Sequence, residues 1–274
     1  MLSTRLHAGV GARAFPSELR AFASTIVNTV AEREIVGLLP HAILHQVPWR
    51  VLLRDAGLEW SQLACGVEFG LFLRAATLSA DDALSSSCIA FGHGVAGEPP
   101  NEIDLQVEAA DFAREFGVAQ LRPACTRAAV TQAMGGRCIV MLSCHGSIRD
   151  RARSSQLALE LADGLSWFDD LIPTRVASDL VILSACESGV YEMGSGDFPV
   201  GAAPALLRAG ARFCIGTRFR VGARFAAGFF PELARGFAAN LPLRVAFAEA
   251  NRIMEGQGAD RWRDLACLEL TGGP

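Results

Sequence analysis

Two short segments of the sequence combine residue types that can cleave an acyl bond. One is Cys144-His145-Gly146, and the other is Ser184-Ala185-Cys186-Glu187-Ser188-Gly189. A cysteine attacks a carbonyl as its thiolate, and a nearby histidine can take the thiol proton and later protonate the leaving group. The N–H groups of Gly146 and Cys186 are candidate donors to the negatively charged oxygen that forms. The residues alone leave ordinary packing open as the alternative role of either cysteine.

Both segments directly follow apolar runs of strand length. The runs at 137–144, 179–185 and 211–216 lack polar alternation, which indicates strands buried on both faces, as in a parallel sheet. Strands that alternate with helices indicate an α/β layered sheet. Because ligands bind beyond the carboxyl ends of parallel strands, His145 and Cys186 can meet if their two strands are neighbours.

The rest of the chain supplies the elements that surround these strands. Helical spacing of apolar residues predicts helices at 17–33, 104–116, 201–209, 223–240 and 244–255. We expect further strands at 34–39, 65–74 and 87–91, and a loop and strand around Pro48 at 44–53. Neither a linker nor an internal repeat is visible, so we predict a single domain at 17–274 that follows an N-terminal extension at 1–16.

Composition excludes several classes of protein. The 274 residues are 51% hydrophobic and 20% charged, which favours a folded core over disorder. A net charge of −4 gives no reason to expect direct binding to nucleic acid or to an anionic membrane. The uncharged stretches at 35–49 and 83–97 are shorter than the ~18 residues that a membrane span requires. We therefore expect a cytoplasmic protein that does not bind membranes.

The cysteines and glycines do not indicate a metal or nucleotide site. Eight cysteines are present without any CxxC spacing, so we expect reduced thiols. A zinc site built from Cys144, His145 and Cys186 is an alternative, but adjacent residues at a strand end rarely chelate one metal ion. The chain contains no lysine, which excludes a Walker A loop. We predict neither a metal nor a cofactor.

A wider set of motifs resembles one known family. The matching segments are Val-Ile-Leu-Ser-Ala-Cys-Glu-Ser-Gly at 181–189, Gly-Asp-Phe-Pro-Val-Gly at 196–201, Ala-Leu-Leu-Arg-Ala-Gly-Ala-Arg at 205–212, Cys-His-Gly at 144–146, Leu-Glu-Leu-Ala-Asp-Gly-Leu at 159–165, the Pro-His and Val-Pro-Trp element at 39–49, and a Glu-Ala-containing helix at 108–116. Together they resemble the CHAT peptidases, caspase-like domains often found beside tetratricopeptide repeats in bacteria. The resemblance covers about residues 17–255.

The resemblance implies a fold and a mechanism. The fold is a caspase-like three-layer sandwich with a central, mainly parallel sheet and helices on both faces, related to separase, gingipain and the caspases. The implied activity is that of a metal-independent cysteine endopeptidase with a Cys-His dyad. By position, Cys186 is the nucleophile, His145 is the acid and base, and the N–H groups of Gly146 and Cys186 form the oxyanion hole.

The resemblance also implies a biological setting. Members of the family commonly act on protein substrates in bacterial defence or regulated cell death, and a sensor activates them. Since one peptidase domain nearly fills the 274 residues, we expect the regulatory or sensor protein to be a separate chain. We expect the segment Tyr191–Phe198 to be a mobile activation loop.

One stretch departs from the family pattern and bears on substrate binding. The usual Leu-Trp-Pro-Val-x-Asp is replaced by Arg-Phe-Arg-Val-Gly-Ala at 218–223. Arg218 and Arg220 are candidates to bind acidic substrate residues, and a solvent-exposed arginine pair is the alternative.

Three further residues are candidates for the substrate cleft. Ser184 and Glu187 flank Cys186 and are expected to line the cleft or to support its loop. Asp197 is expected to bind substrate or to cap the following helix.

Two alternatives remain open. His93 lies in a second strand-end motif, Phe91-Gly92-His93-Gly94, and competes with His145 for the role of the base. At the level of function, the alternative is a catalytically silent caspase-like interaction module. The presence of both Cys186 and His145 favours the enzyme, because an inactive descendant need keep neither residue.

Overall fold

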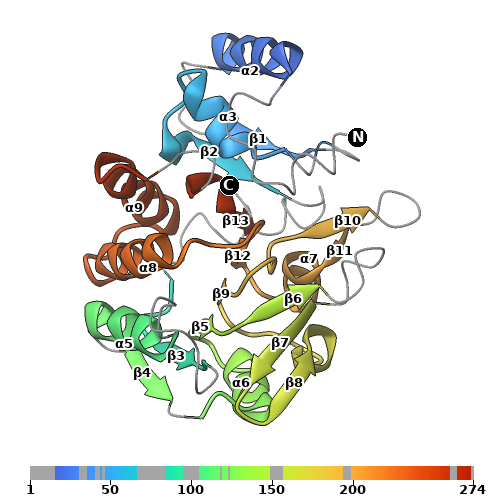
Figure 1. Ribbon diagram of the computed structural model, residues 1–274, viewed down its shortest axis with the longest axis vertical. Coiled ribbons are helices and arrows are strands. Elements are labelled where there is room, and N and C mark those ends of the chain that lie inside the picture. Colours follow the sequence, from blue (N-terminus) through green and yellow to red (C-terminus); the bar gives the residue numbers. More distant parts are fainter. Residues whose placement is uncertain are drawn as a thin grey trace.

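An eight-stranded sheet forms the centre of the protein (Figure 1). The computed structural model describes residues 16–30, 36–40, 44, 47–66, 84–94, 105–117, 119–122, 124–148, 157–193, 199–259 and 264–272. The strand order is β1-β2-β13-β12-β9-β5-β3-β4. These strands are β1 (Val36–Leu38), β2 (Leu63–Cys65), β3 (Cys88–Gly92), β4 (Ala119–Arg122), β5 (Ile139–Ser143), β9 (Leu180–Ser184), β12 (Phe213–Thr217) and β13 (Leu268–Gly272).

The strands that carry the motifs run in the same direction. β5 pairs in parallel with both β9 and β3, and β9 pairs in parallel with β12. At one side of this group β3 pairs in parallel with β4, and at the other side β13 pairs antiparallel to β12. The carboxyl ends of β3, β5, β9 and β12 therefore meet at one edge of the sheet, as a parallel arrangement requires.

Helices cover both faces of the sheet and produce three layers (Figure 1). Three helices pack into the core on one face: α5 (Leu105–Phe116), α8 (Ala223–Ala238) and α9 (Leu243–Gly256). The other face is covered by α6 (Arg127–Met134), α7 (Ala202–Ala209) and a small antiparallel sheet of β6 (Gly146–Ile148), β7 (Leu157–Leu161) and β8 (Gly164–Trp167). The predicted three-layer, mainly parallel α/β architecture is confirmed.

The alternation of side chains within each central strand explains the layers. In β5, Ile139 and Met141 belong to the core beneath α5 and α8, whereas Val140 and Leu142 belong to the core on the other face. All five residues of β5, β9 and β12 are buried. Successive side chains of a strand point to opposite faces, so a strand covered on both sides must be apolar throughout.

Smaller elements complete the fold around the central sheet. A third apolar cluster packs α2 (Ser17–Val30) and α3 (Trp49–Asp55) against β1 and β2. β10 (Tyr191–Met193) pairs antiparallel with β11 (Pro199–Gly201) just before α7. Short 3-10 helices lie at Trp60–Gln62, Phe168–Leu171 and Leu265–Cys267.

Among the described residues one predicted element is wrong, and several elements were not predicted. Beyond Gly66, the predicted strand at 65–74 lies outside the described residues. Residues 49–55 form helix α3 rather than a strand after Pro48. The apolar run Val51-Leu52-Leu53 that indicated a strand is buried by the helix against its neighbours instead. Periodicity cannot separate a short buried helix from a buried strand. Helix α6 and the following strands were not predicted from the sequence: β4, β6, β7, β8, β10, β11 and β13.

The described residues contain neither a membrane-spanning helix nor a metal-binding cluster. No helix among them has both the length and the apolar character needed to cross a bilayer. The same residues contain no cluster of three or more histidine, cysteine or acidic side chains able to hold a metal ion.

Candidate active site

The pairing of β5 with β9 brings the two motifs together. Ser143 pairs with Ser184, and these are the last residues of the two strands. The ladder continues one step further, because the N–H of Cys144 donates to the carbonyl of Ser184 at 3.2 Å. His145 and Cys186 each lie two residues beyond the paired serines. They therefore leave the same edge of the sheet from neighbouring strands, which is the condition for the two side chains to meet.

Gly146 lies against the backbone of Cys186. A Cβ atom built on Gly146 would be 2.6 Å from the carbonyl oxygen and 3.3 Å from the nitrogen of Cys186. Real Cβ atoms essentially never approach another heavy atom to less than 3.0 Å. A side chain at position 146 would therefore push apart the start of β6 and the turn of Cys186, so the close approach requires glycine.

The strand that begins at Gly146 also orients its N–H group. The carbonyl of His145 accepts a hydrogen bond from the N–H of Glu160 on β7 at 2.9 Å. The peptide between His145 and Gly146 is trans, so its N–H points opposite to its carbonyl. The N–H of Gly146 thus points away from β7, toward the opposite side of β6.

Cys186 differs from the other cysteines in its exposure. All eight cysteines are free thiols, and Cys186 is partly exposed whereas the other seven are buried. Burial raises the pKa of Cys65 to about 11 and of Cys125 to about 12, and it raises the pKa of Cys144 well above its usual range. A thiol is reactive as its thiolate, so these buried cysteines remain protonated and inert at neutral pH.

The turn that carries Cys186 is attached to the end of β12. The Ser188 hydroxyl donates to the carbonyl of Leu183 at 2.9 Å and accepts from the N–H of Thr217 at 3.1 Å. The Thr217 hydroxyl donates to the carbonyl of Ala185, the residue before Cys186. Both hydroxyl side chains are fully buried. Polar contacts to the neighbouring strand β12 therefore fix the backbone around Cys186.

Removing the Thr217 hydroxyl tests this attachment. We expect Thr217→Val to lower the free energy of unfolding by about 1–2 kcal/mol, because the buried Ala185 carbonyl loses a donor. Thr29→Val is the matched control, since the Thr29 hydroxyl also donates to a backbone carbonyl but lies on the exposed face of α2. Urea unfolding measures both variants. Equal effects on the two variants would contradict the attachment.

His93 is placed farther from Cys186 than His145 is. Gly92 pairs with Ser143, and the N–H of His93 donates to the carbonyl of Ser143 at 2.9 Å. His93 therefore follows β3, and β5 lies between β3 and β9. With strands about 4.8 Å apart, the backbone of His93 is roughly 10 Å from the line of β9. This geometry favours His145 as the partner of Cys186.

Ser184 and Glu187 both make contacts within the protein. Ser184 is 6% exposed and hydrogen-bonds to the buried carboxyl of Glu108. Glu187 has a φ of 62°, an uncommon value for a residue with a side chain. Its carboxylate accepts from the N–H of Ile148 on β6 at 3.4 Å. These contacts favour the role of loop support over that of lining the cleft.

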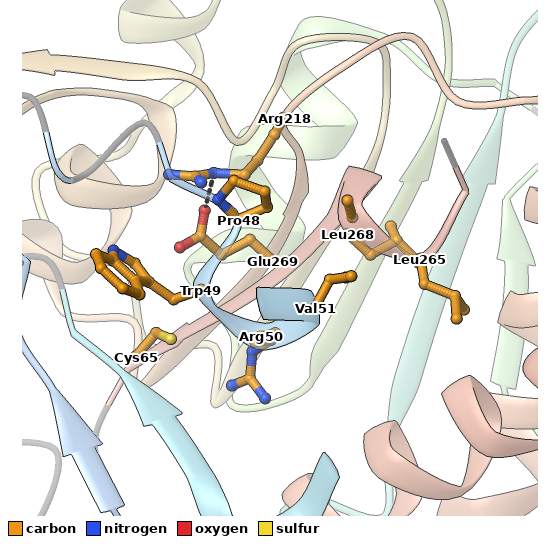
Figure 2. A pocket seen from close by; sticks show the side chains of 10 residues that line it. Pro48, Trp49, Arg50, Val51, Cys65, Arg218, Leu265, Leu268 and Glu269 are labelled. Atoms are coloured by element: carbon orange, nitrogen blue, oxygen red, sulfur yellow. Dashed lines mark ion pairs between the residues drawn. The ribbon is translucent and has the colours of Figure 1, made fainter. Parts of the chain in front are cut away.

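The two arginines after β12 occupy different environments. Arg218 is 8% exposed, forms an ion pair with Glu269 and donates to the carbonyl of Val47 at 2.8 Å. Figure 2 shows Arg218 and Glu269 pointing toward each other in a pocket that is also lined by Trp49. Arg220 is exposed. The interpretation of these residues as a solvent-exposed pair is therefore wrong for Arg218, whose burial and ion pair argue for a structural role.

The remaining predicted residues fall partly outside the described part of the chain. Asp197 lies outside the described residues, as does the rest of the predicted activation loop after Met193. The first three residues of that loop form β10, which pairs with β11 directly after the loop.

Three supporting residues had no role predicted from the sequence: Thr217, Ser188 and Glu108. Glu108 and Ser188 lie in segments that resemble the family, the Glu-Ala-containing helix and the motif at 181–189, but Thr217 carried no signal, because its partner is distant in sequence.

Comparison with known proteins identifies the family of the chain. The model of the CHAT domain family matches residues 21–263. No curated protein sequence matches the chain.

Solved structures share the fold at low sequence identity. The Arg-specific cysteine proteinase gingipain R has a TM-score of 0.61 and 14% identity, with 98% of this chain and 69% of that chain covered. The complex of the pro- and mature domains of RgpB from Porphyromonas gingivalis has a TM-score of 0.60, 12% identity and coverage of 98% and 71%. The separase–securin complex of Saccharomyces cerevisiae has a TM-score of 0.58, 16% identity and coverage of 88% of this chain but 15% of that chain. The fold is therefore caspase-like.

Proposed function

The chain belongs to the CHAT domain family, and from this premise we propose that it is a cysteine endopeptidase with Cys186 as nucleophile and His145 as general acid and base. The observation that carries the proposal is the register of β5 with β9, which leads both residues out of the same sheet edge. The partial exposure of Cys186, unlike that of the other cysteines, further supports it.

The proposed reaction proceeds through a thioester. His145 takes the proton of the Cys186 thiol, and the sulfur attacks the carbonyl carbon of the scissile peptide bond. The carbon–nitrogen bond breaks as His145 returns the proton to the leaving amine. Water, deprotonated by His145, then attacks the thioester, and the thiol of Cys186 is regenerated with release of the acid.

The negative charge on the carbonyl oxygen requires donors in both addition steps. We assign this role to the N–H groups of Gly146 and Cys186. The direction of the Gly146 N–H and the contact of Gly146 with the Cys186 backbone support the assignment. Such preorganised donors typically contribute a large share of the rate of acyl transfer.

The substrate is proposed to be a protein, and Arg220 is the candidate to select an acidic residue near the cleaved bond. The side chain of Arg220 is exposed, whereas that of Arg218 is buried. We further propose that a separate regulatory or sensor protein controls the activity, in bacterial defence or cell death. A peptide library tests the selectivity: a preference for acidic residues that Arg220→Ala removes supports it, and an unchanged preference contradicts it.

Covalent labelling tests the central proposal. The probe is a mixture of peptidyl acyloxymethyl ketones that covers each class of side chain next to the electrophile. We expect one label per chain, located on Cys186 by peptide mass spectrometry and absent from Cys186→Ala. His145→Ala is expected to slow labelling by about 100-fold or more, because the thiol loses its base.

Two matched variants control for the neighbourhood of the site. Cys144→Ala removes the buried thiol next to His145, and His93→Ala removes the competing histidine; both are expected to label at the wild-type rate. Label on a cysteine other than Cys186 would contradict the proposal, as would a His93→Ala variant that loses labelling while His145→Ala keeps it. A folded wild type that neither labels nor cleaves the library would indicate the silent interaction module.

A further inference from the structure

A buried carboxyl lies beneath the sheet edge that carries the candidate site. Glu108 belongs to the first turn of α5 and is 2% exposed. The helix packs on β3, where a Cβ atom built on Gly92 would be 2.6 Å from the Cα atom of Gln106. The start of α5 therefore touches the strand end closely enough to require glycine there, and this contact holds Glu108 in place.

The carboxyl connects the ends of β5 and β9. The Ser143 hydroxyl donates to Oε1 of Glu108 at 2.8 Å, and the Ser184 side chain also hydrogen-bonds to this carboxyl. Ser143 and Ser184 are paired in the sheet and are the last residues of their strands. One carboxyl thus joins the two positions from which the chain continues to His145 and Cys186.

Burial of this carboxyl is energetically unfavourable. Burial raises the pKa of Glu108 to about 7, and the hydrogen bonds from Ser184 and Ser143 lower it in part. Among the described residues, no cationic side chain shifts the pKa of Glu108. A buried carboxyl without a cationic partner destabilises a fold relative to an apolar side chain. Ionisable groups held in such environments are typical of functional sites.

The backbone hydrogen bonds between β5 and β9 end next to the contact of Glu108 with Ser143 and Ser184. The last ladder hydrogen bond between the two strands is that from Cys144 to Ser184, and β6 then turns away to pair with β7. Beyond this point the sheet no longer sets the distance between the two segments that carry His145 and Cys186. Side-chain contacts at Ser143 and Ser184 are therefore well placed to determine it.

We propose that Glu108 is a positioning residue for the site: by accepting hydrogen bonds from Ser143 and Ser184, it fixes the distance between the chain segments that carry His145 and Cys186. The proposal rests on the proposed peptidase function. It assigns Glu108 no contact with substrate and no proton transfer in the reaction.

Three changes at the contact test the proposal. Glu108→Ala removes both acceptors and is expected to lower kcat and the rate of Cys186 labelling by about 10- to 100-fold, with KM changed less than twofold, because misplacement of reacting groups affects the chemical step. Glu108→Gln keeps the shape and one accepting oxygen and is expected to stay within about threefold of wild type. The double variant Ser143→Ala with Ser184→Ala is expected to match Glu108→Ala, and all three changes together are expected to add little further loss.

Two controls on the same helix separate positioning from other effects. Glu115→Gln removes a partly exposed carboxylate that pairs with Arg235 and controls for charge. Phe112→Leu trims a fully buried ring and controls for loosening of α5. Both are expected to retain wild-type kcat, and thermal unfolding records the stability of every variant.

The outcomes distinguish this proposal from the proposed function. A folded wild type without labelling or cleavage overturns both. With an active wild type, wild-type kcat in Glu108→Ala overturns the positioning role alone. So does a loss in Phe112→Leu as large as that in Glu108→Ala, because loosening would then suffice. A loss in Glu108→Gln equal to that in Glu108→Ala overturns it as well, because charge rather than the accepted hydrogen bonds would be responsible.

Discussion

Gly146→Ala is expected to lower kcat/KM for peptide hydrolysis by roughly 100- to 1,000-fold, the range found for loss of one oxyanion donor. The added methyl group would lie 2.6 Å from the Cys186 carbonyl oxygen, which is backbone and cannot rotate away. Either the nucleophile turn or the start of β6 must shift. The shift separates the N–H of Gly146 from the oxygen that it is proposed to stabilise. Steady-state kinetics on a peptide cleaved by the wild type measures the effect.

A second glycine provides the matched control. Gly256 ends α9, and a Cβ atom built there meets no other atom within 4 Å. Gly256→Ala is therefore expected to keep wild-type kcat/KM. Circular dichroism and thermal unfolding show whether Gly146→Ala remains folded at the assay temperature. A folded Gly146→Ala protein with wild-type kcat/KM would contradict the assigned role of this contact.

Glu108→Gln is expected to stabilise the protein above neutral pH. Burial raises the pKa of Glu108 from 4.5 to about 7, so the folded protein holds this proton more tightly than the unfolded chain does. Between these two values the unfolded chain loses the proton first, and stability falls as the pH rises. The difference of pKa corresponds to about 3 kcal/mol, fully lost above pH 7. The glutamine has no proton to lose and avoids this loss.

The measurement is the difference in free energy of unfolding between Glu108→Gln and wild type at several pH values. We expect this difference to rise in favour of the variant by about 3 kcal/mol between pH 4.5 and pH 8. The groups that face the Glu108 carboxyl are the hydroxyls of Ser143 and Ser184 and the thiol of Cys144. The pKa of that thiol lies far above the range from pH 4.5 to pH 8, so the thiol does not titrate there.

Glu115→Gln is the control of opposite sign. Hydrogen bonding to Arg235 lowers the pKa of Glu115, so its contribution to stability is present at neutral pH and disappears as the pH falls. Relative to wild type, this variant should lose stability at neutral pH and recover it in acid. A difference for Glu108→Gln that does not change with pH would contradict the buried, uncompensated carboxyl.

The central strands were predictable because their physical signal is local. Each of the runs at 139–143, 180–184 and 213–217 is apolar throughout, and a strand buried on both faces must be so. The short helix at 49–55 was not predictable in the same way, because three consecutive apolar residues suit a strand and a buried helix alike. The small sheet of β6, β7 and β8 also escaped prediction, since its strands are only three to five residues long.

The sequence by itself determined the family, the layered fold and the candidate pair Cys186 and His145, because motifs and apolar runs are written in neighbouring residues. The tertiary structure decided which contacts support that pair. The hydrogen bond of Ser143 to Glu108 spans 35 positions, and the bond of Thr217 to Ala185 spans 32. The same holds for Arg218, whose burial depends on Glu269 from β13 and on the carbonyl of Val47, 171 positions away. The burial and partner of a polar side chain depend on which distant segments the fold brings to it, and no local pattern records that.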